Sequence, residues 1–156
     1  MPAKDVTDAR PTDPGPEARF RRPADEVVRR AARRAVKGGK ASFRSQAAFR
    51  EAVLALLRRD EPLATVGGLR LRRLLVEVPG VHLSVHYTER STGGPPETCP
   101  VCGGELAPIR NRTLTGESVV LGQKCRRCDY WTHGKRRVPV RYLFSAARLD
   151  GRPVRR

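Results

Sequence analysis

The chain has 156 residues, and its 32 lysines and arginines against 16 acidic residues give a net charge of +16 at pH 7. This length predicts one or two small domains. No apolar run reaches the roughly 18 residues that a membrane-spanning helix needs, and the N-terminus lacks the basic-then-apolar order of a signal peptide. We therefore expect a soluble, cytoplasmic protein that does not contact a membrane.

The positive charge is concentrated in two blocks. Residues 1–18 carry a charge of −2, residues 19–59 carry +10, residues 60–98 carry −1 and residues 99–156 carry +9. Such blocks predict a polyanionic partner. Of the basic residues 27 are arginine, whose planar guanidinium matches phosphate oxygens and guanine edges. A GC-rich genome would explain the arginine bias equally well, but it would not explain the shortage of acidic residues.

The N-terminal part predicts a tail followed by a basic helix. Residues 1–23 contain five prolines and almost no apolar cluster, which is typical of a disordered tail. Residues 24–37 have the apolar periodicity of a helix that ends at Gly38-Gly39. The opposite face of this helix is either a solvated surface or a phosphate-binding surface formed by Arg29, Arg30, Arg33 and Arg34.

Two more helices and a strand are expected before the middle of the chain. Apolar spacing predicts helices over residues 45–59 and 68–76, and strict alternation predicts a strand over residues 81–89. This order of elements is that of a winged-helix module, and equally that of an α+β platform that docks a second module. In a winged helix, the recognition helix would present three outward cations, Arg70, Arg72 and Arg73.

The predicted strand has a polar face that includes His82 and His86. Four positions along a strand place their backbones about 13 Å apart, so they are not expected to chelate one ion together. The following residues 90–98 are rich in glycine and proline, and we expect a linker between two domains there.

All four cysteines lie in the C-terminal block. They form two C-x2-C pairs, Cys99 with Cys102 and Cys125 with Cys128. Four thiolates in two such turns complete a tetrahedron around one structural Zn²⁺ and leave no open position for catalysis. Two disulfides are disfavoured in a reduced cytosol, and a rubredoxin-like iron centre finds no other support in the chain.

Around these cysteines the sequence resembles a zinc ribbon, through Cys99, Pro100, Cys102 and Gly103 in the first knuckle and Cys125 and Cys128 in the second. The resemblance covers residues 99–144 and implies antiparallel strands near residues 105–111, 118–124 and 138–144, with a hairpin turn at 113–117. Asp129 departs from the frequent pattern, in which glycine stands at that position. Residues 145–156 would form a basic tail, so the expected fold is α+β, a basic helical module followed by a small zinc ribbon.

The ribbon is surrounded by candidate nucleic-acid contacts. Lys124, Arg126 and Arg127 could instead offset the negative charge of a zinc–thiolate centre, and Trp131 could either stack on an unpaired base or pack on the ribbon core. The candidates in this block are Arg110, Arg112, Arg126, Arg127, Lys135, Arg136, Arg137, Arg141 and Trp131.

The chain contains no Gly-rich phosphate loop, no H-E-x-x-H motif, no nucleophile elbow and no promising pair of carboxylates. We therefore expect neither an enzyme nor a small-molecule substrate. The leading interpretation is a DNA-binding transcriptional regulator or transcription-associated factor, with contact to RNA polymerase through the ribbon. The alternatives are an RNA-binding component of a ribosome or other ribonucleoprotein machine, and a protein–protein adaptor.

Overall fold

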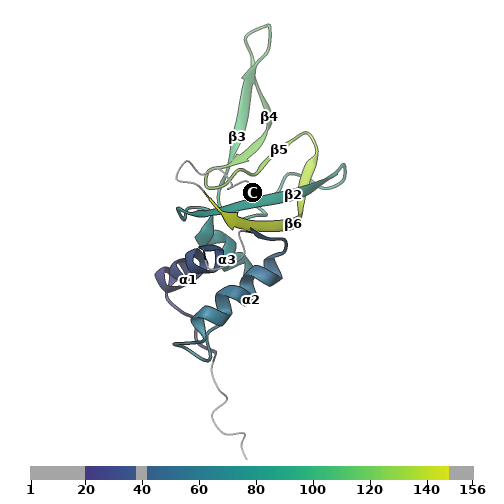
Figure 1. The fold of residues 1–156 in the computed structure, drawn as a ribbon. Coiled ribbons are helices and arrows are strands. Elements are labelled where there is room, and N and C mark those ends of the chain that lie inside the picture. Colours follow the sequence, from purple (N-terminus) through teal and green to yellow (C-terminus); the bar gives the residue numbers. More distant parts are fainter. Residues whose placement is uncertain (1–19, 38–41, 148–156) are drawn as a thin grey trace, which may run out of the picture.

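A computed structural model describes residues 20–37 and 42–147. It is an α+β structure with three helices and two small antiparallel sheets (Figure 1). Residues 1–19 of the expected tail, Gly38-Gly39 and residues 148–156 lie outside the described residues. Within the described ranges, none of the helices has the length and apolar character needed to cross a membrane.

The three helices lie where the apolar periodicity predicts them. They are α1, Asp25–Lys37; α2, Gln46–Leu57; and α3, Gly68–Leu75. The hydroxyl of Ser45 accepts a hydrogen bond from the Ala48 N–H at 3.1 Å and so caps the N-terminus of α2. The described chain is ordered before residue 24, because the Arg21 N–H donates to the Leu63 carbonyl at 2.9 Å.

The first sheet contains β1, Ser42–Phe43; β2, Val81–Arg90; and β6, Arg136–Ala146, in the order β1-β6-β2. The three helices cover one face of this sheet. The ring of Phe49 on α2 stacks on that of Phe144 on β6, with 4.3 Å between ring centroids. Both side chains are fully buried, so this contact fixes the helices against the central strand.

The prediction that residues 138–144 form a ribbon strand is wrong. These residues belong to β6, which pairs with β2 from Val81↔Ala146 to Arg90↔Arg136. The physical reason is burial, since Phe144 is enclosed by the helices. Residues 91–135 are therefore inserted between two neighbouring strands of the first sheet, and residues 145–147, expected in the basic tail, continue or adjoin β6.

The second sheet contains β3, Leu106–Arg112; β4, Ser118–Cys125; and β5, Trp131–His133, in the order β3-β4-β5. The turn predicted at residues 113–117 is present, with the Thr113 N–H donating to the Glu117 carbonyl at 2.9 Å. The strand β5 was not predicted from the sequence. The β3–β4 hairpin projects away from the helices and the first sheet (Figure 1).

Candidate metal centre and surrounding cations

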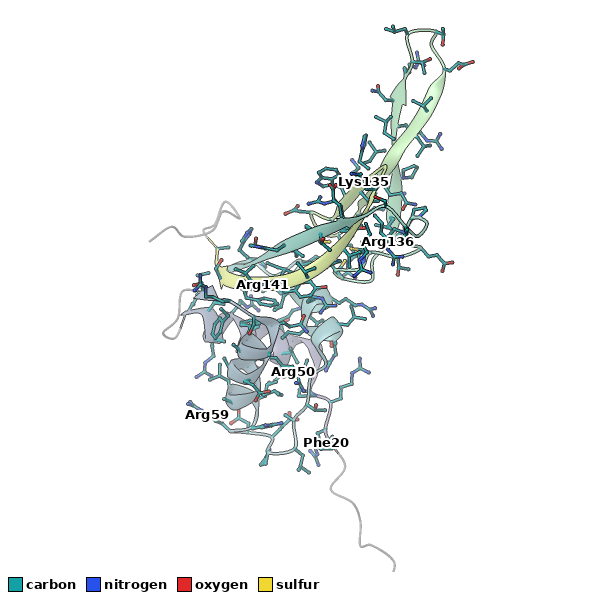
Figure 2. All side chains as sticks on the ribbon, turned by 90° about the vertical axis from the view of Figure 1, so that its right-hand side faces the viewer. Phe20, Arg50, Arg59, Lys135, Arg136 and Arg141 are labelled. Carbon is teal, nitrogen blue, oxygen red and sulfur yellow. The ribbon has the colours of Figure 1, made fainter. Side chains whose placement is uncertain are left out.

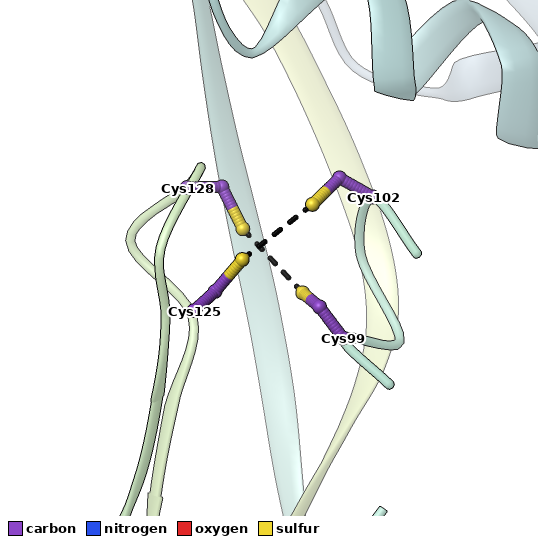
Figure 3. Close-up of side chains that lie close together, drawn as sticks. All are labelled: Cys99, Cys102, Cys125 and Cys128. Carbon is purple, nitrogen blue, oxygen red and sulfur yellow. Dashed lines mark hydrogen bonds between the residues drawn. The ribbon is translucent and has the colours of Figure 1, made fainter. Parts of the chain in front are cut away.

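The four cysteines come together from two turns. Cys99 and Cys102 precede β3, while Cys125 ends β4 and Cys128 lies in the turn before β5. All four sulfur atoms lie within 4.8 Å of one another. Cys99 Sγ is 3.5 Å from Cys128 Sγ, and Cys102 Sγ is 3.6 Å from Cys125 Sγ (Figure 3).

Backbone hydrogen bonds hold both turns in shape. The Gly103 N–H donates to the Cys99 carbonyl at 2.7 Å, and Gly103 has a φ of 69°, a value that glycine adopts without a steric cost. In the second turn the Arg127 N–H points at Cys125 Sγ, 3.3 Å away. Such N–H groups stabilise thiolate charge on the sulfur.

This donor set fits one divalent metal ion. Thiolate sulfur binds Zn²⁺ at about 2.3 Å, which corresponds to about 3.8 Å between the sulfurs of a tetrahedron, and the sulfur distances lie close to that edge. The four cysteines form no disulfide. Four soft sulfur donors in a closed, buried arrangement favour Zn²⁺ in a structural role.

The thiols cannot all be charged without a cation. The pKa of Cys99 is lowered to about 5, first because the Cys128 thiol donates to its sulfur and then because backbone N–H groups also donate. Burial raises the pKa of Cys102 to about 11. Binding a divalent cation would therefore displace protons from the remaining thiols.

The cysteine cluster is packed against the first sheet. Tyr130 is buried beneath the cysteines, and its hydroxyl donates to the Arg137 carbonyl at 3.0 Å. Val85, Tyr87 and Tyr142 of the first sheet pack against the same cluster. The cysteine cluster thus lies between the second sheet and the face of the first sheet that the helices also cover.

Two arginines of α3 lie beside the first knuckle, and for Arg72 this corrects the expectation of an outward side chain. Arg72 is half-buried; it donates from Nε to the Val101 carbonyl at 2.6 Å, donates to Gln46 Oε1 and stacks over Tyr142. Arg73 remains exposed, and its Nε lies 3.4 Å from the Cys102 carbonyl. A helical wheel shows a face of a helix, but not partners that lie far away in the sequence.

Arg70 is also directed inward. It donates to the Pro23 carbonyl and to Asp25 Oδ1, both at 2.5 Å, and its side chain is only 15% exposed. This bond holds the pKa of Asp25 below its usual value. The expected recognition helix therefore has two of its three arginines engaged inside the molecule.

Arg127 of the second knuckle connects the two parts of the chain. Its Nε donates to Glu77 Oε1 at 2.7 Å, which lowers the pKa of Glu77, and its Nη2 lies 3.3 Å from the Arg73 carbonyl. Both Arg127 and Arg73 place positive charge beside the cysteines. This placement fits the expected offset of a zinc–thiolate charge.

Trp131 does not pack in the ribbon core, a position that Tyr130 occupies instead. The Trp131 side chain is 47% exposed. The Arg137 guanidinium lies 4.3 Å from the centroid of the Trp131 ring and 4.2 Å from that of Tyr87. Trp131 and Arg137 both line a groove of about 630 Å³ between β2 and the second knuckle.

The remaining predicted contacts lie on the surface. Arg29 and Arg33 face Glu26 at 3.6 and 2.9 Å, Arg126 faces Glu105 at 3.6 Å, and Lys135 faces Glu89 at 4.0 Å. Within the described residues, the exposed candidates without an ion-pair partner are Arg30, Arg34, Arg73, Arg110, Arg112, Arg136 and Arg141.

Comparison of the chain with protein-family models, with curated proteins and with solved structures gives no match. The class of site is therefore defined by its own geometry. Four clustered cysteines in two C-x2-C turns are consistent with a zinc ribbon module. Zinc and metal binding are supported by this cluster.

Proposed function

We propose that the protein is a non-enzymatic, zinc-containing nucleic-acid-binding protein. The observation that carries this proposal is the charge on the open face of the first sheet, opposite the helices and the cysteines. Because successive side chains of a strand alternate between faces, the register identifies the residues of this face. They are His82, Ser84, His86, Thr88 and Arg90 on β2, and Arg136, Val138, Arg141, Leu143 and Ser145 on β6.

The cations on this face are placed beside one another rather than beside carboxylates. Arg90 is directly opposite Arg136, and Arg141 lies on the same face. Like charges at opposed positions destabilise a sheet, and this face carries no acidic residue. An anionic partner that spans the face would relieve this repulsion, and nucleic acid offers phosphates in a regular row.

The cationic face continues toward the ribbon. In Figure 2, Arg141 lies along the first sheet, while Arg136 and Lys135 lie close to the base of the β3–β4 hairpin. All three side chains are exposed. This continuity supports a single binding surface that includes both the sheet and the ribbon.

A winged-helix mode of DNA binding has less support. Insertion of α3 into a major groove would need Arg70 and Arg72 to leave Asp25 and Val101. We therefore place the contacts on the sheet and ribbon, with DNA as the leading partner and a role in transcription as its most direct use. RNA binding in a ribonucleoprotein machine and an adaptor role are the alternatives that the experiment separates.

The test is a fluorescence anisotropy titration of the full chain with labelled 30-nucleotide probes of double- and single-stranded DNA and RNA, at 50 and 200 mM salt. The Arg136→Ala/Arg141→Ala variant should lose about two units of the slope of log affinity against log salt and bind at least tenfold more weakly. The matched control, Arg34→Ala/Arg59→Ala, removes the same charge from exposed positions on α1 and after α2, on the helical side, and should bind as the wild type does.

Preference for RNA probes would favour the ribonucleoprotein alternative. Absence of binding to all four probes at 50 mM salt would leave only the adaptor. Equal losses for both variants would contradict the assignment of the open face, because total charge alone would then govern binding.

A further inference from the structure

The β3–β4 hairpin is a free-standing arm over most of its length. β5 pairs with β4 only from Gly122↔His133 to Lys124↔Trp131. Beyond these residues, the described parts of β3 and β4 pair only with each other. A two-stranded ribbon is marginally stable in water. A free-standing arm of this length therefore contributes little to the stability of the fold, and its form requires another explanation.

The tip of the arm presents one apolar side chain on an ordered turn. Leu114 is fully exposed, at 109% of its reference area. The turn that carries it is fixed by the Gly116 N–H, which donates to the Thr113 carbonyl at 3.0 Å, and by Thr113 Oγ1, which accepts from the Glu117 N–H at 3.0 Å. Leu114 is therefore held in water by a defined structure, and burial of its side chain on binding would be favourable.

One face of the arm leading to this tip is cationic. The register places Arg110 opposite Val120 and Arg112 opposite Ser118, and all four side chains are exposed. Neither arginine has an ion-pair partner among the described residues. The base of the arm adjoins Lys135 and Arg136 of the cationic surface (Figure 2).

We propose that the hairpin enters a groove of double-stranded DNA and inserts Leu114 between two stacked base pairs, while Arg110 and Arg112 contact the flanking phosphates. This inference rests on the proposed nucleic-acid binding. An apolar side chain at an ordered tip unstacks a base step, and the cost of unstacking is offset by the contacts that the bent duplex gains. A protein partner would instead favour a broad apolar patch, whereas this tip offers one apolar side chain between two threonines.

The experiment compares two 30-base-pair DNA probes that differ only by one central T·T mismatch. The mismatched step is already weakened, so insertion there costs less, and the wild type should bind this probe on the order of tenfold more tightly. Leu114→Ala should bind both probes equally, whereas Leu114→Phe should keep the preference. Leu63→Ala, which removes an exposed leucine on the helical side, is the matched control and should behave as the wild type.

The outcomes separate the proposed insertion of Leu114 from the proposed nucleic-acid binding. Equal binding of both probes by the wild type, or a preference that survives in Leu114→Ala, overturns the insertion and leaves nucleic-acid binding intact. Binding of single-stranded RNA without binding of either duplex has the same consequence. Failure to bind any nucleic acid at 50 mM salt overturns both. Zinc content and the exchange rates of the hairpin amides verify that each variant is folded.

Discussion

Two parts of this molecule are stabilised by different means. The helical half consists of α1 to α3 and the first sheet, and the ribbon half consists of the inserted residues 91–135. In the helical half, side chains such as Phe49, Val53 and Leu71 are fully buried in one continuous apolar core. In the ribbon half, the buried apolar cluster consists of three cysteines together with Val101 and Tyr130. One half is thus stabilised by apolar burial, whereas the other half contains four clustered cysteines that could bind one metal ion.

This difference affects what each half can display. An apolar core requires that elements cover one another, so the helices have little freedom in how they are arranged. A metal centre stabilises two short turns locally, so the strands that extend from it need not be covered. The exposed β3–β4 arm is compatible with the second kind of core and not with the first.

Removal of the metal should have the largest effect. Structural zinc supplies about 10–16 kcal/mol of apparent free energy to small metal-dependent folds, so chelation should unfold residues 99–135 while α1 and α2 stay folded. Hydrogen exchange would show rapid exchange in β3, β4 and β5 with retained protection in the helices. Cys102→Ser should reproduce the result without a chelator. If the amides of β3, β4 and β5 stayed protected from exchange in a metal-free sample, the ribbon half would not depend on the metal, and the proposed difference between the two halves would be wrong.

Phe49→Ala should affect the opposite half. Loss of a buried phenyl ring that stacks on Phe144 should lower the free energy of unfolding of the helical half by about 3–5 kcal/mol. The protein should still bind one zinc ion per chain. Urea unfolding followed by the helical circular dichroism signal gives the first quantity, and a colorimetric zinc assay gives the second. Ala55→Ser, at an exposed position on α2, is the control and should be nearly neutral.

Arg72→Ala should weaken the connection between the two halves. Its guanidinium contacts Gln46, Val101 and Tyr142 at once, so we expect a loss of about 1–3 kcal/mol. The loss should appear in both the helical and the ribbon probes. Lysine cannot reproduce the planar fork, so Arg72→Lys should not restore stability. Arg73→Ala removes a longer hydrogen bond from an exposed side chain, so it should lower the free energy of unfolding by less. An equal decrease for the two variants would show that Arg72 does not connect the two halves more strongly than Arg73 does.

The smallest effect should come from Asp25→Asn, within the helical half. Because Arg70 lowers the pKa of Asp25, the ionised carboxylate stabilises the fold above its usual pKa of 3.8 and loses this contribution as the pH falls through the lowered value. The wild type should therefore melt at a slightly higher temperature than the variant at pH 7. The difference should shrink as the pH falls below 3.8, and a difference that does not depend on pH would contradict the ionic contribution.

Local pattern was sufficient for the helices, the hairpin turn and the metal ligands. Three-residue and four-residue apolar spacing identified α2 around Phe49, and two C-x2-C pairs identified all four cysteines of the cluster. These features depend on residues that are close in sequence, or on a spacing that only one kind of chemistry requires.

Partners far apart in the sequence were not predictable in this way. The alternation in residues 138–144 fits either sheet, and only packing against Phe49 decides between them. Arg72 donates to the carbonyl of Val101, which is 29 residues away in the sequence, and local periodicity does not predict a contact between residues so far apart. The cationic face of the first sheet was missed for the same reason, since Arg90 and Arg136 become neighbours only through the pairing of β2 with β6.

The insertion of the ribbon between β2 and β6 has a consequence for folding during synthesis. The four cysteines leave the ribosome before residues 136–146, so the nascent chain can bind zinc while β2 still lacks its partner. A metal ion bound by Cys99, Cys102, Cys125 and Cys128 would cross-link residues 99–128, which shortens the loop between β2 and β6 and reduces the entropy lost on closing it. We therefore expect the metal to accelerate completion of a sheet that contains none of its ligands.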